Sequence, residues 1–247
     1  DNYLPKLVRF GLRVAICDQL EDPKNTKGIV KRGVTELVTP GLSYNDLVLD
    51  VKKNNFLAAI YYSKENIGIS FLDISTGEFL VSEGNKIYID KLLQSFKPNE
   101  ILFQRDYKSK IIDEFNLSTN YFFIDEWVFN RDYTNDLLLK QFQVKSLKGF
   151  GVSELQDALI SAGVILHYLN ETHHHKTQHI LSINRIEQDK YLWMDKFTIN
   201  NLELFSSNNE SATTLFNVLN KTHSPMGARL LRRWVALPFK NIKSLNY

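Results

Sequence analysis

The sequence predicts an α/β fold: a mixed sheet with helices packed on it, flanked by a short α+β remnant and an all-α segment. Three β-like runs with short turns between them, at 56–63, 67–75 and 77–82, predict an antiparallel meander. After them the apolar residues recur at helical spacing, and short β-like runs alternate with helical ones. From about residue 181 the pattern becomes helical. We therefore expect three parts, at residues 1–42, 43–181 and 182–247.

The N-terminal stretch reads as a helix followed by two strands. Leu4, Leu7 and Val8 have helical spacing, RVAIC is a short buried strand, and residues 29–38 are β-like. A unit of this length cannot easily hold a core of its own. The sequence opens without Met, and a helix begins almost at once. We therefore expect a piece of a longer chain.

The middle stretch continues with alternating helices and strands. Helices are expected at 86–96 and 108–114, and strands at 101–103 and 121–124. Two further helices follow, for which Thr134 and Ser153 are the expected N-caps. A meander followed by α-β-α-β-α-α resembles the ribonuclease-H-like fold.

The C-terminal stretch is expected to be all-α. Helices are expected at 189–204, 214–219 and 225–236. Ser224 and Pro225 form the N-cap and first position of the last helix.

Composition excludes several classes of protein. The 247 residues are 43% hydrophobic and 23% charged, which argues against a disordered chain. A net charge of +2 gives no general basic field, so contact with nucleic acid must be local. The single cysteine, Cys17, excludes a disulfide framework. No apolar run approaches the ~20 residues of a membrane span, and no phosphate-binding glycine loop occurs.

Two groups of residues raise the alternative of a metal-dependent nuclease. The first is the histidine cluster 173–179, in which His175 and His179 have the i, i+4 spacing of a zinc pair. We favour solvated loop histidines, because the cluster follows a helix end. The second is Asp73 on an apolar strand face, with Asp125 further on. The favoured interpretation is a partly buried Asp that caps a turn or pairs with a neighbour. The first strand, FLAAIYYS, has no acid for two-metal chemistry, which argues against a nuclease.

Two basic clusters are the candidate nucleic-acid contacts. Residues 221–243 hold three Lys, three Arg and no acid, and the three arginines share one helical face. Such a face can also be simply solvated or bind carboxylates of a neighbouring helix, and we favour this structural interpretation. The candidate residues are Lys27, Lys31, Arg32, Arg229, Arg232 and Arg233.

Three stretches of the sequence together carry a family resemblance. Residues 12–41, LRVAICDQLEDPKNTKGIVKRGVTELVTPG, resemble the end of the mismatch-binding domain in the MutS family of bacterial DNA mismatch-repair proteins. Residues 193–205, WMDKFTINNLELF, resemble the start of its core, or lever, domain. Residues 222–238, THSPMGARLLRRWVALP, match the family pattern T-x-P-M-G-x-R-L-L-R-R-W. The region between them is where the connector domain of the family belongs.

The resemblance implies a non-catalytic piece of such a protein. Residues 1–42 would be the end of domain I, 43–181 the connector domain II, and 182–247 the start of domain III. The connector would link the mismatch-binding and lever domains and recruit the partner protein MutL. The full-length family implies an ATPase that uses ATP and Mg, a homodimer, mismatched duplex DNA as ligand, and a cytoplasmic, nucleoid-associated location. No catalytic, metal or cofactor residue can be carried over, and a purely structural linker remains a third possibility.

Overall fold

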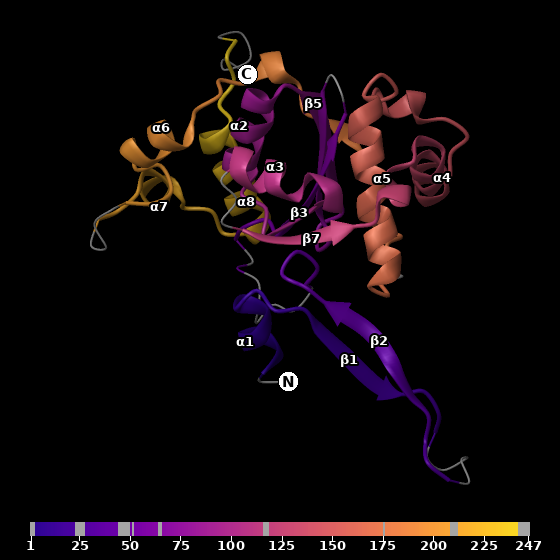
Figure 1. The fold of residues 1–247 in the computed structure, drawn as a ribbon. Helices are drawn as coiled ribbons and strands as arrows, with labels where there is room; N and C mark the ends of the chain where they lie inside the picture. Colours follow the sequence, from indigo (N-terminus) through magenta and orange to yellow (C-terminus); the bar gives the residue numbers. More distant parts are fainter. Residues whose placement is uncertain are drawn as a thin grey trace.

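The computed structural model describes residues 3–22, 28–43, 50, 52–63, 66–115, 119–174, 176–207 and 212–241. Its centre is a six-stranded mixed sheet in the order β7-β6-β3-β4-β5-β8 (Figure 1). The strands are β3 (Phe56–Tyr62), β4 (Ile67–Asp73), β5 (Glu78–Gly84), β6 (Glu100–Gln104), β7 (Asn120–Ile124) and β8 (Asn184–Arg185). The predicted α/β class is confirmed, and the narrower ribonuclease-H-like assignment stays a prediction.

The predicted meander is present. β3 pairs antiparallel with β4, and β4 with β5. β6 runs parallel to β3, and β7 parallel to β6, because a helix separates each strand from the one before it. The sheet also gains β8, which pairs parallel with β5 inside the stretch predicted to be all-α. That prediction was wrong there, because a two-residue strand leaves no periodic signal.

Both faces of the sheet are covered by helices, which explains why β3 and β4 are apolar almost throughout. Side chains of β3 alternate between the two layers: Leu57 and Ala59 belong to one cluster, and Ala58 and Ile60 to the other. Gly68 of β4 permits the close approach of the longest helix, because an added Cβ would overlap the Asp157 backbone.

The eight α-helices of the described residues mostly begin and end as expected. They are α1 (Leu4–Arg9), α2 (Lys86–Phe96), α3 (Lys108–Phe115), α4 (Arg131–Phe142), α5 (Gln156–Glu171), α6 (Lys196–Asn201), α7 (Leu215–Leu219) and α8 (Pro225–Ala236). Short 3-10 turns lie at η1 (Arg105–Tyr107), η2 (Glu126–Phe129), η3 (Leu147–Phe150) and η4 (Gln188–Lys190). α4 and α5 lie on one side of the sheet, and α2 and α3 on the other (Figure 1).

Two predicted N-caps were wrong. Thr134 lies inside α4, because Asn130 caps the helix by accepting hydrogen bonds from the amides of Asp132 and Tyr133. At α5 the Ser153 side chain caps nothing. Instead, the Glu83 carboxylate reaches over from β5 and accepts from the amides of Asp157 and Ala158. A carboxylate from another element is favourable at a helix N-terminus but invisible to a local capping rule.

The helix predicted over 189–204 was also wrong. The chain forms η4 and then has no helix until Asp195, whose side chain caps the short helix α6. Asp, Ser, Thr and Asn favour caps over helix interiors, so one Asp divided an otherwise helical pattern. The helix predicted at the end is confirmed as α8, with Ser224 at the N-cap and Pro225 at the first position.

The N-terminal part contains α1 and the antiparallel pair β1 (Val14–Gln19) and β2 (Arg32–Val38). This hairpin extends away from the main sheet (Figure 1). Within the described residues, no helix has the length and apolar character needed to cross a membrane.

Candidate functional site

A cleft of about 490 Å³ lies where the N-terminal part, the main sheet and α8 meet. Val8 and Pro40 line it from the N-terminal part, Asn55 and Phe96 from the middle, and Arg229 from the C-terminal part. Residues of all three predicted parts therefore share one concave surface.

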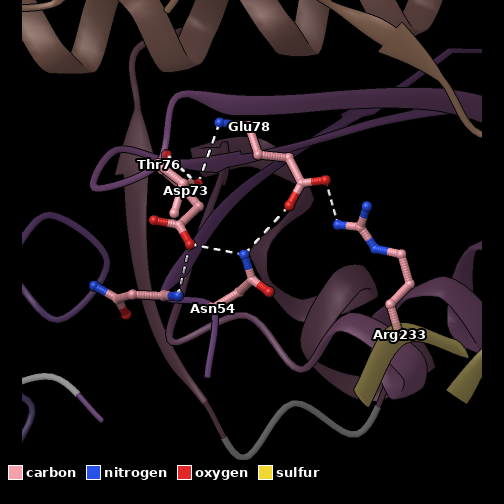
Figure 2. A network of polar contacts seen from close by, with 6 residues as sticks. Asn54, Asp73, Thr76, Glu78 and Arg233 are labelled. Atoms are coloured by element: carbon pink, nitrogen blue, oxygen red, sulfur yellow. Dashed lines mark hydrogen bonds and ion pairs between the residues drawn. The ribbon is translucent and has the colours of Figure 1, made fainter. Parts of the chain in front are cut away.

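A polar network joins the sheet to α8 beside this cleft (Figure 2). The Arg233 guanidinium donates to the Glu78 carboxylate of β5, with both side chains less than one-third exposed. Asn54 Nδ2 links two carboxylates, lying 3.2 Å from Glu78 Oε2 and 2.8 Å from Asp73 Oδ2. The arginine of one helix is thus bonded through Glu78 and Asn54 to the buried end of β4.

Asp73 is fully buried and serves the turn between β4 and β5. Its Oδ1 accepts from the amide and the hydroxyl of Ser75, and its Oδ2 accepts from Asn54 and from the Asn55 amide. These donors satisfy the carboxylate, as burial requires. The expected turn-capping role is confirmed, although Asp73 is fully and not partly buried.

The nuclease alternative is contradicted by the sheet. Asp73 lies opposite Phe56 at the start of β3, whereas Asp125 follows the end of β7, which runs parallel to β3 through β6. The two carboxylates therefore lie at opposite ends of the sheet, and Asp125 is exposed near Arg105. The described residues form no group of three or more His, Cys, Asp or Glu able to hold a metal.

The histidine cluster does not form a metal site in the described part of the chain, and His175 lies outside it. His173 is exposed, as expected for a loop. His174 is buried instead, with Nε2 3.3 Å from the Leu37 carbonyl and Nδ1 3.6 Å from Glu36. His179 Nε2 lies 2.6 Å from the Ile74 carbonyl. The interpretation as solvated histidines was therefore wrong for His174, which joins the end of α5 to β2.

A buried carboxylate holds the other junction of the sheet. Glu100 of β6 is 2% exposed. Its Oε2 accepts from the Thr39 hydroxyl and from the Gly41 amide at 3.0 Å, and its Oε1 accepts from the Tyr168 hydroxyl at 2.6 Å. Three donors from the N-terminal part and α5 thus converge on one side chain.

The surroundings of Glu100 leave little room for change. A Cβ at Gly41 would lie 2.8 Å from Glu100 Cβ, so the close approach requires glycine. Burial raises the pKa of the Tyr168 hydroxyl above its usual range, and the nearby Glu100 carboxylate raises it further. Tyr168 therefore keeps its proton and remains a donor to Glu100 at neutral pH.

Two further contacts strengthen this junction. The Leu37 amide donates to the Thr172 carbonyl at the end of α5. The Arg13 guanidinium lies 3.6 Å from the ring centre of Phe122 on β7. The N-terminal hairpin is thus attached to α5, β6 and β7 through several independent contacts.

The basic residues predicted as nucleic-acid contacts lie in two places, at the N-terminal hairpin and on α8. Lys31 and Arg32 are exposed at the start of β2, and Lys27 lies outside the described residues. The α8 arginines are half-buried and all line the cleft. The Arg232 guanidinium lies 4.3 Å from the Phe205 ring centre, and burial lowers the pKa of Arg232 below its usual range. Arg233 binds a carboxylate, as the structural interpretation allows, but the partner, Glu78, lies on a strand and not on a neighbouring helix.

Sequence reasoning missed Glu100 and Glu83. Each is an acid beside an apolar run, Glu100 before ILF and Glu83 after FLVS. An acid at that place is a signal of a buried or capping carboxylate, but it does not identify the partner.

Comparisons with known proteins match three successive stretches of the chain. Family models match residues 1–46 as MutS domain I, 55–181 as MutS domain II and 197–247 as MutS domain III. A Fowlpox virus resolvase, solved with its substrate Holliday junction DNA, covers 47% of this chain and 97% of its own, at a TM-score of 0.35 and 12% identity. That likeness is too weak to support an argument.

Similar curated relatives are each named DNA mismatch repair protein MutS. The Flavobacterium psychrophilum protein is 60% identical over 98% of this chain, and the Flavobacterium johnsoniae protein 59% identical over 99%. The Cytophaga hutchinsonii protein is 58% identical over 98% of this chain. In each case the chain spans 28% of the length of the relative. The chain belongs to the MutS family of DNA mismatch-repair proteins.

Proposed function

We propose that this chain is a non-catalytic connecting part of a mismatch-repair protein. Residues 43–181 act as a connector between a mismatch-binding part, residues 1–42, and a lever part, residues 182–247. The observation that carries the proposal is that carboxylates of the central sheet bind side chains or amides of both neighbouring parts. Glu100 on β6 receives the N-terminal part, and Glu78 on β5 receives α8. A ribonuclease-H-like sheet would serve here as a rigid support.

The connector also recruits MutL in this proposal. The support for this recruitment is a sheet domain whose described residues form no group of three or more His, Cys, Asp or Glu that could hold a metal. The test is a titration of fluorescently labelled MutL with this chain, whose folding is checked by circular dichroism. We expect saturable binding. Absence of binding at high micromolar concentration of folded chain would rule out recruitment by this part alone.

Two variants, one on each face of the connector sheet, test in that titration which face contacts MutL. Trp127 is 60% exposed beside α5, and its ring meets Tyr133 at a tilt and His167 edge to face, so the ring is held in place. Ile87 is 68% exposed on α2, on the opposite face of the sheet. Interface hot spots are enriched in Trp. We expect Trp127→Ala to weaken MutL binding by roughly tenfold or more, and Ile87→Ala to leave it unchanged. The reverse result would place the partner on the α2 face.

Mismatched duplex DNA, a homodimer, ATP and Mg belong in this proposal to the full-length protein in the bacterial cytoplasm, at the nucleoid. For this chain we expect no ATP hydrolysis and no preference for a mismatched duplex over a matched one. Weak, salt-sensitive DNA binding is expected through Lys31 and Arg32 of the exposed hairpin, together with Lys27 and the α8 arginines. A gel-shift series with matched and mismatched duplexes tests this, and a clear mismatch preference would contradict it.

A further inference from the structure

The cleft at the junction of the three parts is strongly basic. Among the described residues that line it, six are basic and one, Asp50, is acidic. The basic residues are Arg9, Lys53, Lys97, Arg229, Arg232 and Arg233. Lys53 pairs with Asp50 at 2.9 Å, and Arg233 with Glu78. Basic side chains thus outnumber acidic ones six to one in the described lining, in a chain whose overall charge is only +2.

A buried amide donor adds to this positive lining. Asn55 lines the cleft and is 3% exposed. Its Oδ1 accepts from Asn99 Nδ2, whereas its own Nδ2 has no hydrogen-bond partner among the described residues. A buried amide donor without a partner costs free energy, which a ligand oxygen can recover. Asn54 and Asn120 line the same cleft.

The Arg232 guanidinium shows that one wall of the cleft is partly desolvated. Burial lowers the pKa of Arg232, and the Asp50 carboxylate opposes that shift. Charge-assisted hydrogen bonds are stronger in such surroundings than in bulk water. Arginine forks also match the oxygens of phosphate groups.

We infer that this cleft binds a small polyphosphate anion, such as the phosphate chain of a nucleotide. Its volume of about 490 Å³ lies within the size range of small-molecule sites. Specific duplex binding, by contrast, spreads over a much larger exposed surface. The lining residues come from all three parts, so a bound anion would hold α1, the sheet and α8 together.

The test is isothermal titration calorimetry, in which tripolyphosphate is titrated into the whole chain at low salt. We expect saturable binding that weakens as salt increases. Arg9→Gln with Arg229→Gln removes two lining charges and is expected to weaken binding roughly tenfold or more. Lys221→Gln with Lys240→Gln is the matched control, because both residues are exposed and neither lines the cleft. Its affinity should equal that of the unchanged chain.

A third variant is expected to change the affinity for tripolyphosphate in the opposite direction. Asp50→Asn removes the acid of the described lining and is expected to tighten binding about two- to fivefold. Loss of folding cannot produce such a gain. The proposal is overturned if the unchanged chain does not bind tripolyphosphate, if both double variants lose affinity equally, or if Asp50→Asn has no effect. It is also overturned if only a short duplex oligonucleotide binds through Arg9 and Arg229, because the face would then contact DNA backbone.

Discussion

The connector sheet is joined to its two neighbours by contacts of different kinds. At β6, the Glu100 carboxylate is almost fully buried and accepts hydrogen bonds from two hydroxyls and a backbone amide, all of them neutral donors. At β5, Glu78 pairs with Arg233 at the edge of a cleft of about 490 Å³, and both side chains are partly exposed. We call these the Glu100 joint and the Glu78 joint.

The difference indicates which neighbour can separate from the sheet. Hydrogen bonds to a buried carboxylate are insulated from salt, and breaking them leaves unsatisfied groups. A partly exposed ion pair is weaker, and salt screens it. The N-terminal part should therefore stay with the sheet, while α8 can be released by modest changes in charge or salt.

The largest expected effect is at the Glu100 joint. Glu100→Ala leaves the Thr39 hydroxyl, the Gly41 amide and the Tyr168 hydroxyl without their acceptor. We expect the free energy of unfolding to fall by about 3 kcal/mol, measured by urea denaturation. Glu154→Ala, at an exposed position, is the control and should change it by less than about 0.5 kcal/mol. Equal effects would remove the distinction between a buried and an exposed acid.

A second prediction concerns the pH dependence of the same joint. Tyr168→Phe removes the donor to Glu100 Oε1 and should cost about 1.5 kcal/mol at neutral pH. Burial and Glu100 raise the pKa of Tyr168 in the folded chain above the ordinary value of 10.0. The unfolded chain therefore loses this proton first, so the contribution of Tyr168 is complete below pH 10 and declines above it.

Urea denaturation of both chains below and above that pH provides the measurement. The difference in unfolding free energy between the unchanged chain and Tyr168→Phe should shrink as the pH rises above 10. The comparison cancels the effects of other tyrosines, such as Tyr62, whose pKa burial also raises. A constant difference would mean that Tyr168 ionises equally in the folded and unfolded chains.

The Glu78 joint should give a smaller, salt-dependent effect. A double-mutant cycle of Arg233→Gln and Glu78→Gln isolates the pair, which is expected to contribute about 1 kcal/mol at low salt. Screening should reduce that coupling by roughly half or more at 1 M salt. A coupling free energy above about 3 kcal/mol that does not change with salt would mean that the Glu78 joint is as well shielded from solvent as the Glu100 joint.

The smallest expected effect is at Arg13, which strengthens the Glu100 joint from outside. Arg13→Gln removes the cation–π contact with Phe122 and should cost about 0.5 kcal/mol in urea denaturation. Lys6→Gln, on α1 and exposed, is a charge-matched control. If Arg13→Gln lowered the free energy of unfolding as much as Glu100→Ala is expected to, then Arg13, and not Glu100, would be the main support of the joint.

Local patterns in the sequence were enough to predict most of the fold. The meander, α2 and α8 follow from residue periodicity and from caps adjacent in sequence. The errors occurred where a distant residue decided the outcome. The N-terminus of α5 is capped by Glu83 of β5, and the short strand β8 pairs with the edge of β5. The spacing of residues along the chain does not reveal such distant partners.

The candidate site was predicted less well than the fold. The basic face of α8 was visible in the sequence, since Arg229, Arg232 and Arg233 recur at helical spacing. Neither the Glu78 partner of Arg233 nor the cleft was visible, because they form only when three parts of the chain meet. Glu100 was missed because burial of an acid depends on donors from Thr39, Gly41 and Tyr168.

The most direct test of the difference between the two joints is amide hydrogen exchange at low and high salt. Amide protection reports local opening, so it separates the release of one element from unfolding of the whole chain. We predict that high salt, or Glu78→Gln, accelerates exchange within α8 while the Leu37 and Gly41 amides keep their protection. Equal acceleration at both joints, or acceleration at Gly41 alone, would contradict the account.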